Sequence, residues 1–300
     1  MTIAVLEPRA SCHIRTLESN LFQACGRVCR RAGRAGSLFR SRIFIAALVA
    51  VLLCPEVLGD KSAADSTNLA SGIDLRANFQ KWGLPLRLQG GRGTCSVFAL
   101  TGALEYALAS RQHTGTVLSV EFLNWASNHA TTNSKDGGFF SDLWTGFEVY
   151  GICPETSLPY RENFDPGLHP EARVLQLAKD TAKARLRLIW IKPWNVATGL
   201  TEAQFLKIKR TLAGAWPVCG GFRWPKHEHW QNDVLEMAPA SEVFDGHSVL
   251  LVGFKDDPAQ PGGGIFLIRN SGGGVHDGAL PYEYARSYLN DAAWIEPAEK

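Results

Sequence analysis

A glycine-rich loop that leads directly into a long apolar helix is the feature of this sequence that most constrains its fold. The loop runs from Gln89 to Cys95, and residues 95–111 contain a single Gly and no Pro. The spacing of the apolar residues predicts a helix that is buried on most sides. Most lone cysteines are small buried hydrophobic residues. A cysteine in the first turn of a helix, however, lies beside unpaired backbone N–H groups and the positive end of the helix dipole, so Cys95 is a candidate nucleophile.

Three polar residues elsewhere have the properties that a cysteine nucleophile requires. Gln89 begins the same loop, where its side-chain amide and the backbone N–H of the nucleophile could both donate to an oxyanion. His247 stands at the mouth of a predicted buried strand over residues 248–254 and is a candidate general base. A second predicted strand, over residues 265–268, is followed by Asn270, whose side chain could fix the orientation of the histidine ring.

Predicted helices dominate the chain after the nucleophile loop, and predicted strands follow them. Besides the helix at residues 95–111, helices are expected at residues 119–128, 139–150, 171–185 and 201–212, the last with a capping box from Thr201 and Gln204. Strands are expected at residues 187–191 and 218–222, in addition to the two named above. Helices first and strands second indicate an α+β fold of two lobes. A cleft between lobes is the usual place for a substrate.

The order and spacing of these residues resemble those of the papain-like (C1 family) cysteine peptidases, and more closely their divergent bacterial members. In that family a cysteine near the mature N-terminus is followed by His and Asn roughly 130 to 150 residues later, and here the gaps are about 150 and 175 residues. The resemblance extends from about residue 73 to about residue 296. It implies a helical lobe that carries the nucleophile, an antiparallel β lobe that carries the histidine, and hydrolysis of peptide bonds without a cofactor or a metal.

The resemblance also implies where a substrate would bind. Gly137 and Gly138 would offer backbone hydrogen bonds to an extended peptide, and Asp245 and Gly246 would border the main specificity pocket. The expected partner is therefore a peptide or protein substrate. Two alternatives remain open at this point: a catalytically impaired binding module with the same fold, and a cell-wall amidase or acyltransferase that uses the same Cys and His.

Three departures from the family pattern concern the rate, the substrate range and the rigidity of the loops. Ser96 follows the nucleophile where the family usually has an aromatic residue, and Gly272 stands where the family usually has a tryptophan. Arg92 and Lys135 occupy the positions of a disulfide that commonly ties the nucleophile loop to the Gly-Gly loop. None of these departures removes a catalytic atom.

The missing tryptophan predicts a replacement. In the family that ring covers the hydrogen bond between Asn and His, and a shielded hydrogen bond is stronger than an exposed one. We expect another aromatic ring to pack over Asn270, and the nearest candidates along the chain are Trp230, Tyr282 and Trp294.

The N-terminal region has the parts of an export signal. Residues 1–59 hold eight Arg and three Glu, and residues 43–54 form a nearly continuous apolar run. Such a run is typical of a signal peptide and is short for a membrane span, which needs about 20 residues. We expect cleavage after Gly59 and a periplasmic or extracellular protein, with membrane attachment only if the run is retained as an anchor. Residues 60–72 are interpreted as a linker, too short for a folded pro-segment, and residues 73–300 as the peptidase domain.

Charge and composition argue against other functional classes. The formal net charge is +2, but the leader carries the positive excess, so the remainder is slightly acidic and gives no reason to expect nucleic-acid binding. His227 and His229 are expected in a surface loop, because no second pair of metal ligands follows them. Cys153 and Cys219 could form a disulfide, although their spacing does not require one.

Overall fold

The structure is a computed structural model that describes residues 69–298, apart from the side chains of Phe244 and Asp245. The described residues belong to one compact unit. The predicted leader and most of the predicted linker lie outside the described residues. Within residues 69–298, no helix is long and apolar enough to cross a membrane. The cleavage site, export and the domain boundaries therefore stay predictions.

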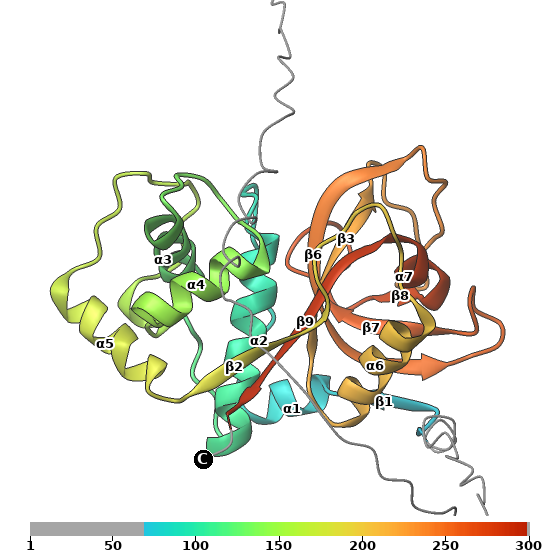
Figure 1. Cartoon of the computed structure of the whole chain (residues 1–300), viewed down its shortest axis with the longest axis horizontal. Helices are drawn as coiled ribbons and strands as arrows, with labels where there is room; N and C mark the ends of the chain where they lie inside the picture. Colours follow the sequence, from blue (N-terminus) through green and yellow to red (C-terminus); the bar gives the residue numbers. More distant parts are fainter. Residues whose placement is uncertain (1–68, 299–300) are drawn as a thin grey trace, which may run out of the picture. The chain divides into compact units, whose positions relative to one another are not determined.

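Four helices form one lobe (Figure 1). They are α2 (Cys95–Gln112), α3 (Val120–Thr131), α4 (Phe140–Tyr150) and α5 (Ala172–Ala182). Helices α3 and α4 pack closely because Gly146 has no side chain: a Cβ there would lie 2.5 Å from the backbone nitrogen of Ser127. A short 3-10 helix, η1 (Glu155–Ser157), lies between α4 and α5 in the chain.

A sheet of nine strands forms the other lobe, and within the described residues its order is β2-β9-β3-β6-β7-β8-β5-β4, with β1 also paired to β6. The strands are β1 (Gly72–Asp74), β2 (Leu186–Lys192), β3 (Val218–Pro225), β4 (Trp230–Gln231), β5 (Val234–Leu235), β6 (Val243–Asp256), β7 (Gly264–Arg269), β8 (Ala279–Pro281) and β9 (Leu289–Pro297). The remaining helices are α1 (Arg76–Lys81), α6 (Glu202–Ala213) and α7 (Tyr282–Tyr288). Both bonds of the predicted capping box at Thr201 and Gln204 are present.

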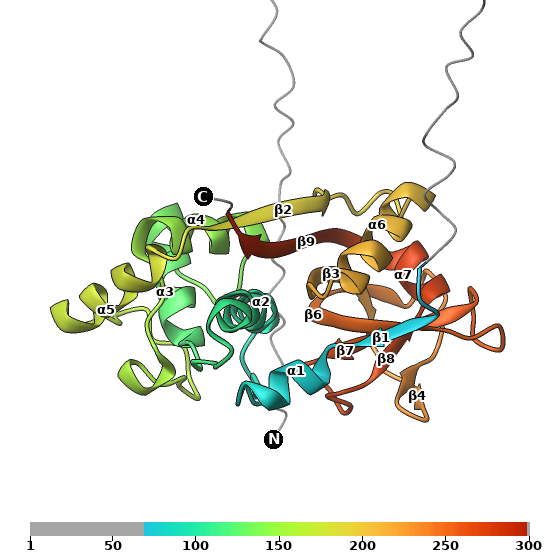
Figure 2. The ribbon, with the colours of Figure 1, turned by 90° about the horizontal axis from the view of Figure 1, so that it is seen from below.

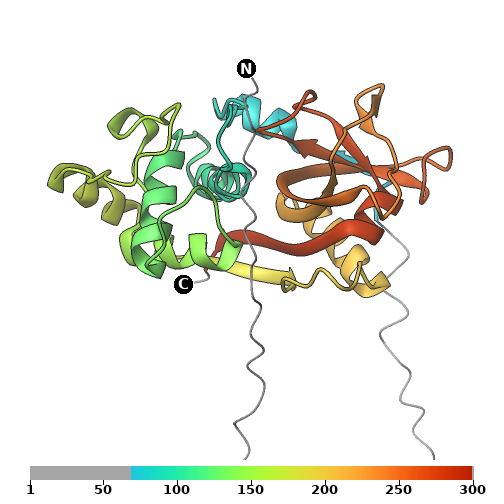
Figure 3. The ribbon, with the colours of Figure 1, turned by 90° about the horizontal axis from the view of Figure 1, so that it is seen from above.

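Helix α2 lies between the other helices of its lobe (α3, α4 and α5) and the sheet. It is seen end-on in Figures 2 and 3. Most of its side chains are buried, as the apolar spacing predicts. A Cβ at Gly102 would lie 3.1 Å from Leu250 on β6, so the helix approaches that strand closely. The first turn of α2, with its cysteine, thereby faces the strand that carries the candidate histidine.

The predicted two-lobed α+β fold is confirmed, and one local expectation is wrong. His247 does not stand at the mouth of a strand, because β6 already begins at Val243 and the histidine lies inside it, paired with Phe222 on β3. Residues 243–247 lack the continuous apolar character that reveals a buried strand. They are extended because β3 offers them hydrogen-bonding partners as far as Pro225.

Candidate active site

The first turn of α2 provides an environment that favours a thiolate. Cys95 is the first residue of the helix and is partly exposed, and the side chain of the preceding Thr94 makes no capping hydrogen bond. Burial acts to raise the pKa of the Cys95 thiol. The hydrogen bond and charge of His247 outweigh it, together with the backbone N–H groups of Ser248 and Ser96, so that this pKa lies below its ordinary value.

The pKa of His247 shifts in the opposite direction, upward. Burial disfavours its charged form, but the hydrogen bond and charge of Cys95, the hydrogen bond to Asn270 and the charge of Glu228 together raise the pKa of the imidazole. A lowered thiol pKa beside a raised imidazole pKa favours a thiolate–imidazolium pair.

Asn270 fixes the ring of His247. Its Oδ1 atom lies 2.7 Å from Nε2 of His247 and also accepts a hydrogen bond from the N–H of Gly272 (3.1 Å). Its Nδ2 atom donates to the carbonyl of Val275 (2.9 Å), and the Asn270 side chain is fully buried, at 0% exposure. Because Oδ1 can only accept, Nε2 must carry a proton, which leaves Nδ1 of the imidazole for the thiol.

Gln89 is held at the start of the nucleophile loop by bonds to both ends of its side chain. Its Oε1 accepts from the hydroxyl of Ser271 (2.9 Å), and its Nε2 donates to the carbonyl of Arg92 (2.8 Å). Its backbone N–H donates to the carbonyl of Ser271 (2.8 Å), which ties the loop to the segment that follows β7. A primary amide has two N–H groups, so one of them is left for a ligand.

The position of Gly272 explains part of the departure from the family pattern. A Cβ at Gly272 would lie 3.0 Å from Oε1 of Gln89 and 3.4 Å from Cε1 of His247. Any side chain here would crowd both residues, because the Gln89 amide already occupies the space beside the His247 ring.

The aromatic ring that packs against His247 is Trp224, which sequence reasoning did not name. The two rings are 4.7 Å apart between centroids, and the indole N–H of Trp224 donates to the carboxylate of Glu228 (2.8 Å). Trp230 lies behind Trp224 and donates its own N–H to the same carboxylate (2.9 Å). The other two candidates are engaged elsewhere: Tyr282 packs against Phe205 and Phe266, and the indole of Trp294 bonds Glu296.

An ion-pair cluster takes the place of the family's disulfide. Arg92, only 5% exposed, pairs with Asp136 just before the Gly-Gly loop (2.7 Å) and with Glu121 on α3 (2.5 Å). Its guanidinium also lies over the ring of Tyr160, 4.7 Å from the centroid. The nucleophile loop and the Gly-Gly loop are therefore joined by charge-assisted hydrogen bonds.

A cavity of about 260 Å³ opens beside Cys95 and His247 and is lined by residues of both lobes. Gly137, Gly138 and Gly246 lie along it, and their role in binding a substrate stays a prediction. The N–H of Gly138 donates to the hydroxyl of Ser96 (3.2 Å), so a peptide that uses this N–H must displace the hydroxyl. The backbone of Asp245, on β6, pairs with that of Trp224 on β3, and the side chain of Asp245 lies outside the described part of the structure.

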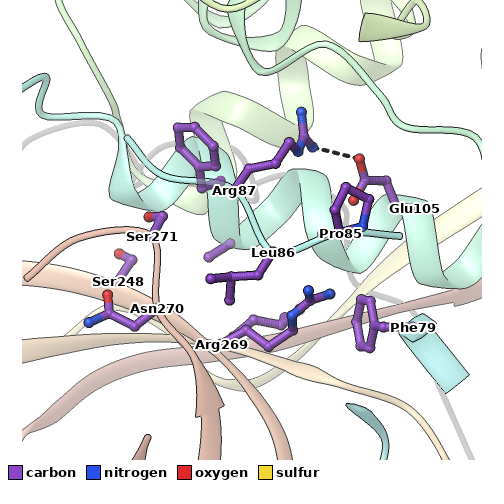
Figure 4. A pocket seen from close by; sticks show the side chains of 13 residues that line it. Phe79, Pro85, Leu86, Arg87, Glu105, Ser248, Arg269, Asn270 and Ser271 are labelled. Carbon is purple, nitrogen blue, oxygen red and sulfur yellow. Dashed lines mark hydrogen bonds and ion pairs between the residues drawn. The ribbon is translucent and has the colours of Figure 1, made fainter. Parts of the chain in front are cut away.

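A second, smaller cavity of about 40 Å³ lies behind the site, and Figure 4 shows the charged groups around it. Arg87 pairs with Glu105 on α2 (2.6 Å), and Glu105 also accepts the N–H of Leu118 (2.8 Å). These bonds hold the segment before Gln89 against the nucleophile helix.

Among the described residues, no other cysteine or histidine lines the cavity beside Cys95 and His247. Cys153 and Cys219 are buried and free, so the possible disulfide is not formed, and burial raises the pKa of both thiols. His227 and His229 are exposed, and residues 69–298 contain no cluster of three or more His, Cys, Asp or Glu that could hold a metal ion.

A Cys–His–Asn arrangement between a helical lobe and a β lobe defines the class of papain-like proteins. The chain belongs to the papain family of cysteine proteases, whose family description matches residues 69–278. A comparison with curated proteins finds no match.

Several solved structures share the fold. Xylellain, a cysteine protease from Xylella fastidiosa, is 20% identical, with a TM-score of 0.58 over 77% of this chain and 88% of that one. The Amb a 11 cysteine protease, a major ragweed pollen allergen, in its proform is 22% identical, with a TM-score of 0.57 over 79% of this chain and 69% of that one. The cysteine protease and lectin-like domains of Cwp84, a surface layer associated protein of Clostridium difficile, are 16% identical, with a TM-score of 0.54 over 77% of this chain and 53% of that one.

Proposed function

We propose that this protein is a cysteine peptidase that hydrolyses peptide bonds through Cys95, His247, Asn270 and Gln89. The observation that carries the proposal is the shared site of Cys95 and His247, whose pKa values move toward each other while Asn270 holds the far side of the imidazole. An ordinary structural cysteine has no such partner, as the raised thiol pKa of Cys153 illustrates.

In the first half of the reaction the Cys95 thiolate attacks the carbonyl carbon of the scissile peptide bond. The carbonyl oxygen becomes an oxyanion, which accepts hydrogen bonds from the backbone N–H of Cys95 and from the second N–H of the Gln89 amide. The intermediate collapses as Nδ1 of the His247 imidazolium gives its proton to the leaving amine. The products are a free amine and a thioester on Cys95.

In the second half, water completes the cycle. Neutral His247 takes a proton from a water molecule, and the resulting hydroxide attacks the thioester carbonyl. The same two donors stabilise the second oxyanion. Collapse releases a carboxylic acid and restores the thiolate–imidazolium pair, so no cofactor is consumed.

Ser96 and Gly272 depart from the family pattern and are the features that favour an impaired binding module, but each has a structural explanation and neither removes a catalytic atom. The hydroxyl of Ser96 bonds the Gly-Gly loop, and the absence of a side chain at Gly272 makes room for the Gln89 amide. We therefore favour a peptidase over a binding module and over a cell-wall amidase or acyltransferase.

The test is hydrolysis of a mixed peptide library by the purified protein, with Cys95→Ala and the buried-thiol variant Cys153→Ala compared in parallel. Cleavage by the wild type and by Cys153→Ala, lost in Cys95→Ala, supports the proposal. Cleavage of peptidoglycan stem peptides or acyl transfer to an added amine, without hydrolysis of ordinary peptides, would favour the amidase or acyltransferase. Peptide binding without any turnover would favour the binding module.

We also propose that the protein is exported. The support is the basic segment followed by the apolar run at residues 43–54, and one protein of similar fold is described as surface layer associated. N-terminal sequencing of the native protein should find a start close to Asp60, whereas a start at Met1 would favour an anchored or cytoplasmic protein.

A further inference from the structure

We propose that the cleft contains a specificity pocket with an acidic floor, Asp291, which selects a substrate residue with a long basic side chain, arginine before lysine. The inference rests on the proposed peptidase function and adds the class of substrate to it. Neither the sequence pattern nor the resemblance pointed to Asp291.

Strand register places Asp291 in the substrate cavity. Asp291 on β9 pairs with Gly221 on β3, and Gly221 pairs in turn with Ser248 on β6, three neighbouring strands of the sheet (Figure 1). Directly paired residues of antiparallel strands present their side chains on the same face. All three residues line the cavity of about 260 Å³ that also includes Cys95 and His247.

Two glycines leave the carboxylate open to the cavity. A Cβ at Gly221 would lie 2.1 Å from Oδ1 of Asp291, so any other residue at this position would collide with the carboxylate. At Gly246, on the neighbouring strand, a Cβ would meet nothing within 4 Å, so there is open space above the floor. A side chain from a substrate can therefore reach the acid.

The Asp291 carboxylate makes no ion pair within the described residues. Asp291 is only 5% exposed. Lys192 on β2 is the charged neighbour, but its Nζ donates to the carbonyls of Asn195 (2.7 Å) and Asn290 (2.5 Å). Burial raises the pKa of Asp291 to about 6, although the charge of Lys192 acts against this. The backbone N–H of Gly221 also acts against the rise. A buried carboxylate without an ion-pair partner is costly, and a cationic ligand would offset that cost.

The walls of the cavity are aromatic, which suits the stem and the head of arginine. Phe139 precedes α4 and Trp194 follows β2, and both line the cavity while remaining 48% and 52% exposed. Their rings meet edge to face with centroids 5.4 Å apart. Phe222 contributes a third ring. Aromatic faces attract cations, and the planar guanidinium stacks on them better than an ammonium does. Arginine is therefore preferred to lysine, and both to leucine.

The experiment compares fluorogenic peptides that carry arginine or its uncharged isostere citrulline, in turn, at each of the four positions before the cleaved bond. For wild type we expect one position at which arginine raises kcat/KM by about 10- to 100-fold over citrulline, the size of effect that a hydrogen bond to a charged group allows. In Asp291→Asn the ratio of kcat/KM for the arginine peptide to kcat/KM for the citrulline peptide should fall to about one. Asp233→Asn, in the exposed turn between β4 and β5, is the matched control and should behave as wild type.

The outcomes separate this inference from the proposed function. If wild type cleaves peptides but no position distinguishes arginine from citrulline, the acidic pocket is wrong and the peptidase stands. If the preference for arginine survives in Asp291→Asn, the acid is not the selector. If wild type cleaves no peptide at all, the proposed function fails and this inference fails with it. The wild-type comparison needs no variant, so it holds even if Asp291→Asn does not fold.

Discussion

The side-chain amide of Asn270 bridges Nε2 of His247, at 2.7 Å, and the carbonyl of Val275, at 2.9 Å. Rotation of the amide by half a turn would set its N–H groups against the Nε2–H of the imidazole and its oxygen against a carbonyl. The network therefore fixes both the amide and the tautomer of the histidine.

Asn270→Ala should lower kcat/KM by about 10- to 100-fold, because it removes a hydrogen bond to an ionised group worth about 1.5–3 kcal/mol. The loss should fall mainly on kcat, since the residue orients the imidazole and does not bind substrate. Asn133→Ala, at an exposed position, is the control. Equal activity in wild type and Asn270→Ala would make the amide incidental to the reaction.

The opposite pKa shifts of Cys95 and His247 predict a bell-shaped dependence of hydrolysis on pH. The thiolate forms as the pH rises through the lowered Cys95 pKa, and the imidazolium is lost as the pH rises through the raised His247 pKa. Alkylation of Cys95 by iodoacetamide should therefore proceed well below the ordinary thiol value of about 8.5.

His247→Ala should move that alkylation to higher pH. Burial would still raise the thiol pKa, whereas the hydrogen bond and charge of His247, which lower it, would be lost. His169→Ala, an exposed histidine, should leave the profile unchanged. An identical pH profile in wild type and His247→Ala would refute the ion pair.

Gln89→Ala should reduce turnover by about 100- to 1000-fold, the usual effect of removing one oxyanion donor. Gln89 also bonds Arg92 and Ser271, so loop disorder is a competing explanation. Thermal melting separates the two, since loss of a donor alone leaves the melting temperature close to that of wild type. Gln80→Ala is a matched exposed control, and full activity of Gln89→Ala would remove the residue from the site.

Glu228 is a positioning residue whose charge acts on His247 through space. Its carboxylate accepts the indole N–H groups of Trp224 and Trp230, and its charge raises the His247 pKa after the larger effects of Cys95 and Asn270. Glu228→Gln removes the charge and should shift the basic limb of the kcat/KM profile to lower pH by a fraction of a unit. Glu236→Gln, exposed and nearby in sequence, should not. A basic limb that stays in place would show that the carboxylate only anchors the two indoles.

Arg92→Met should destabilise the fold by about 3–5 kcal/mol, because it leaves Glu121 buried without its partner. Arg161→Met removes an exposed ion pair with Asp165 and should cost about 0–1 kcal/mol. Urea denaturation measures both free energies of unfolding. The described cysteines are free, so a reducing agent should not change the unfolding of residues 69–298. If Arg92→Met lost less free energy of unfolding than Arg161→Met, the Arg92 cluster would not be a main source of stability.

The sequence could predict the helices, most of the central strands and the residues that meet at the candidate site, because each has a local signal. The Gly-rich loop marks the start of the helix that carries Cys95, and apolar runs lie beside His247 and Asn270. The structure brings these three side chains together, and their catalytic roles stay predictions.

Features that depend on strand register could not be predicted. Trp224 reaches His247 because β3 pairs with β6 so that Phe222 lies opposite His247. Asp291 lies on β9, whose sequence shows no alternation of polar and apolar residues, and its place in the cavity follows from its pairing with Gly221. The Arg92 cluster joins residues 29 and 44 positions apart, and no local pattern predicts which opposite charges will meet in a core.

The most direct test of the central claim is covalent labelling by a peptidyl epoxide, read by intact-protein mass spectrometry and peptide mapping. We expect one adduct per chain, mapped to Cys95, formed faster than on Cys153 or Cys219, and slowed strongly in His247→Ala. Labelling should abolish peptide hydrolysis in proportion to the adduct formed. No adduct, or an adduct that persists unchanged in Cys95→Ala, would contradict the claim that Cys95 is the activated nucleophile of this protein.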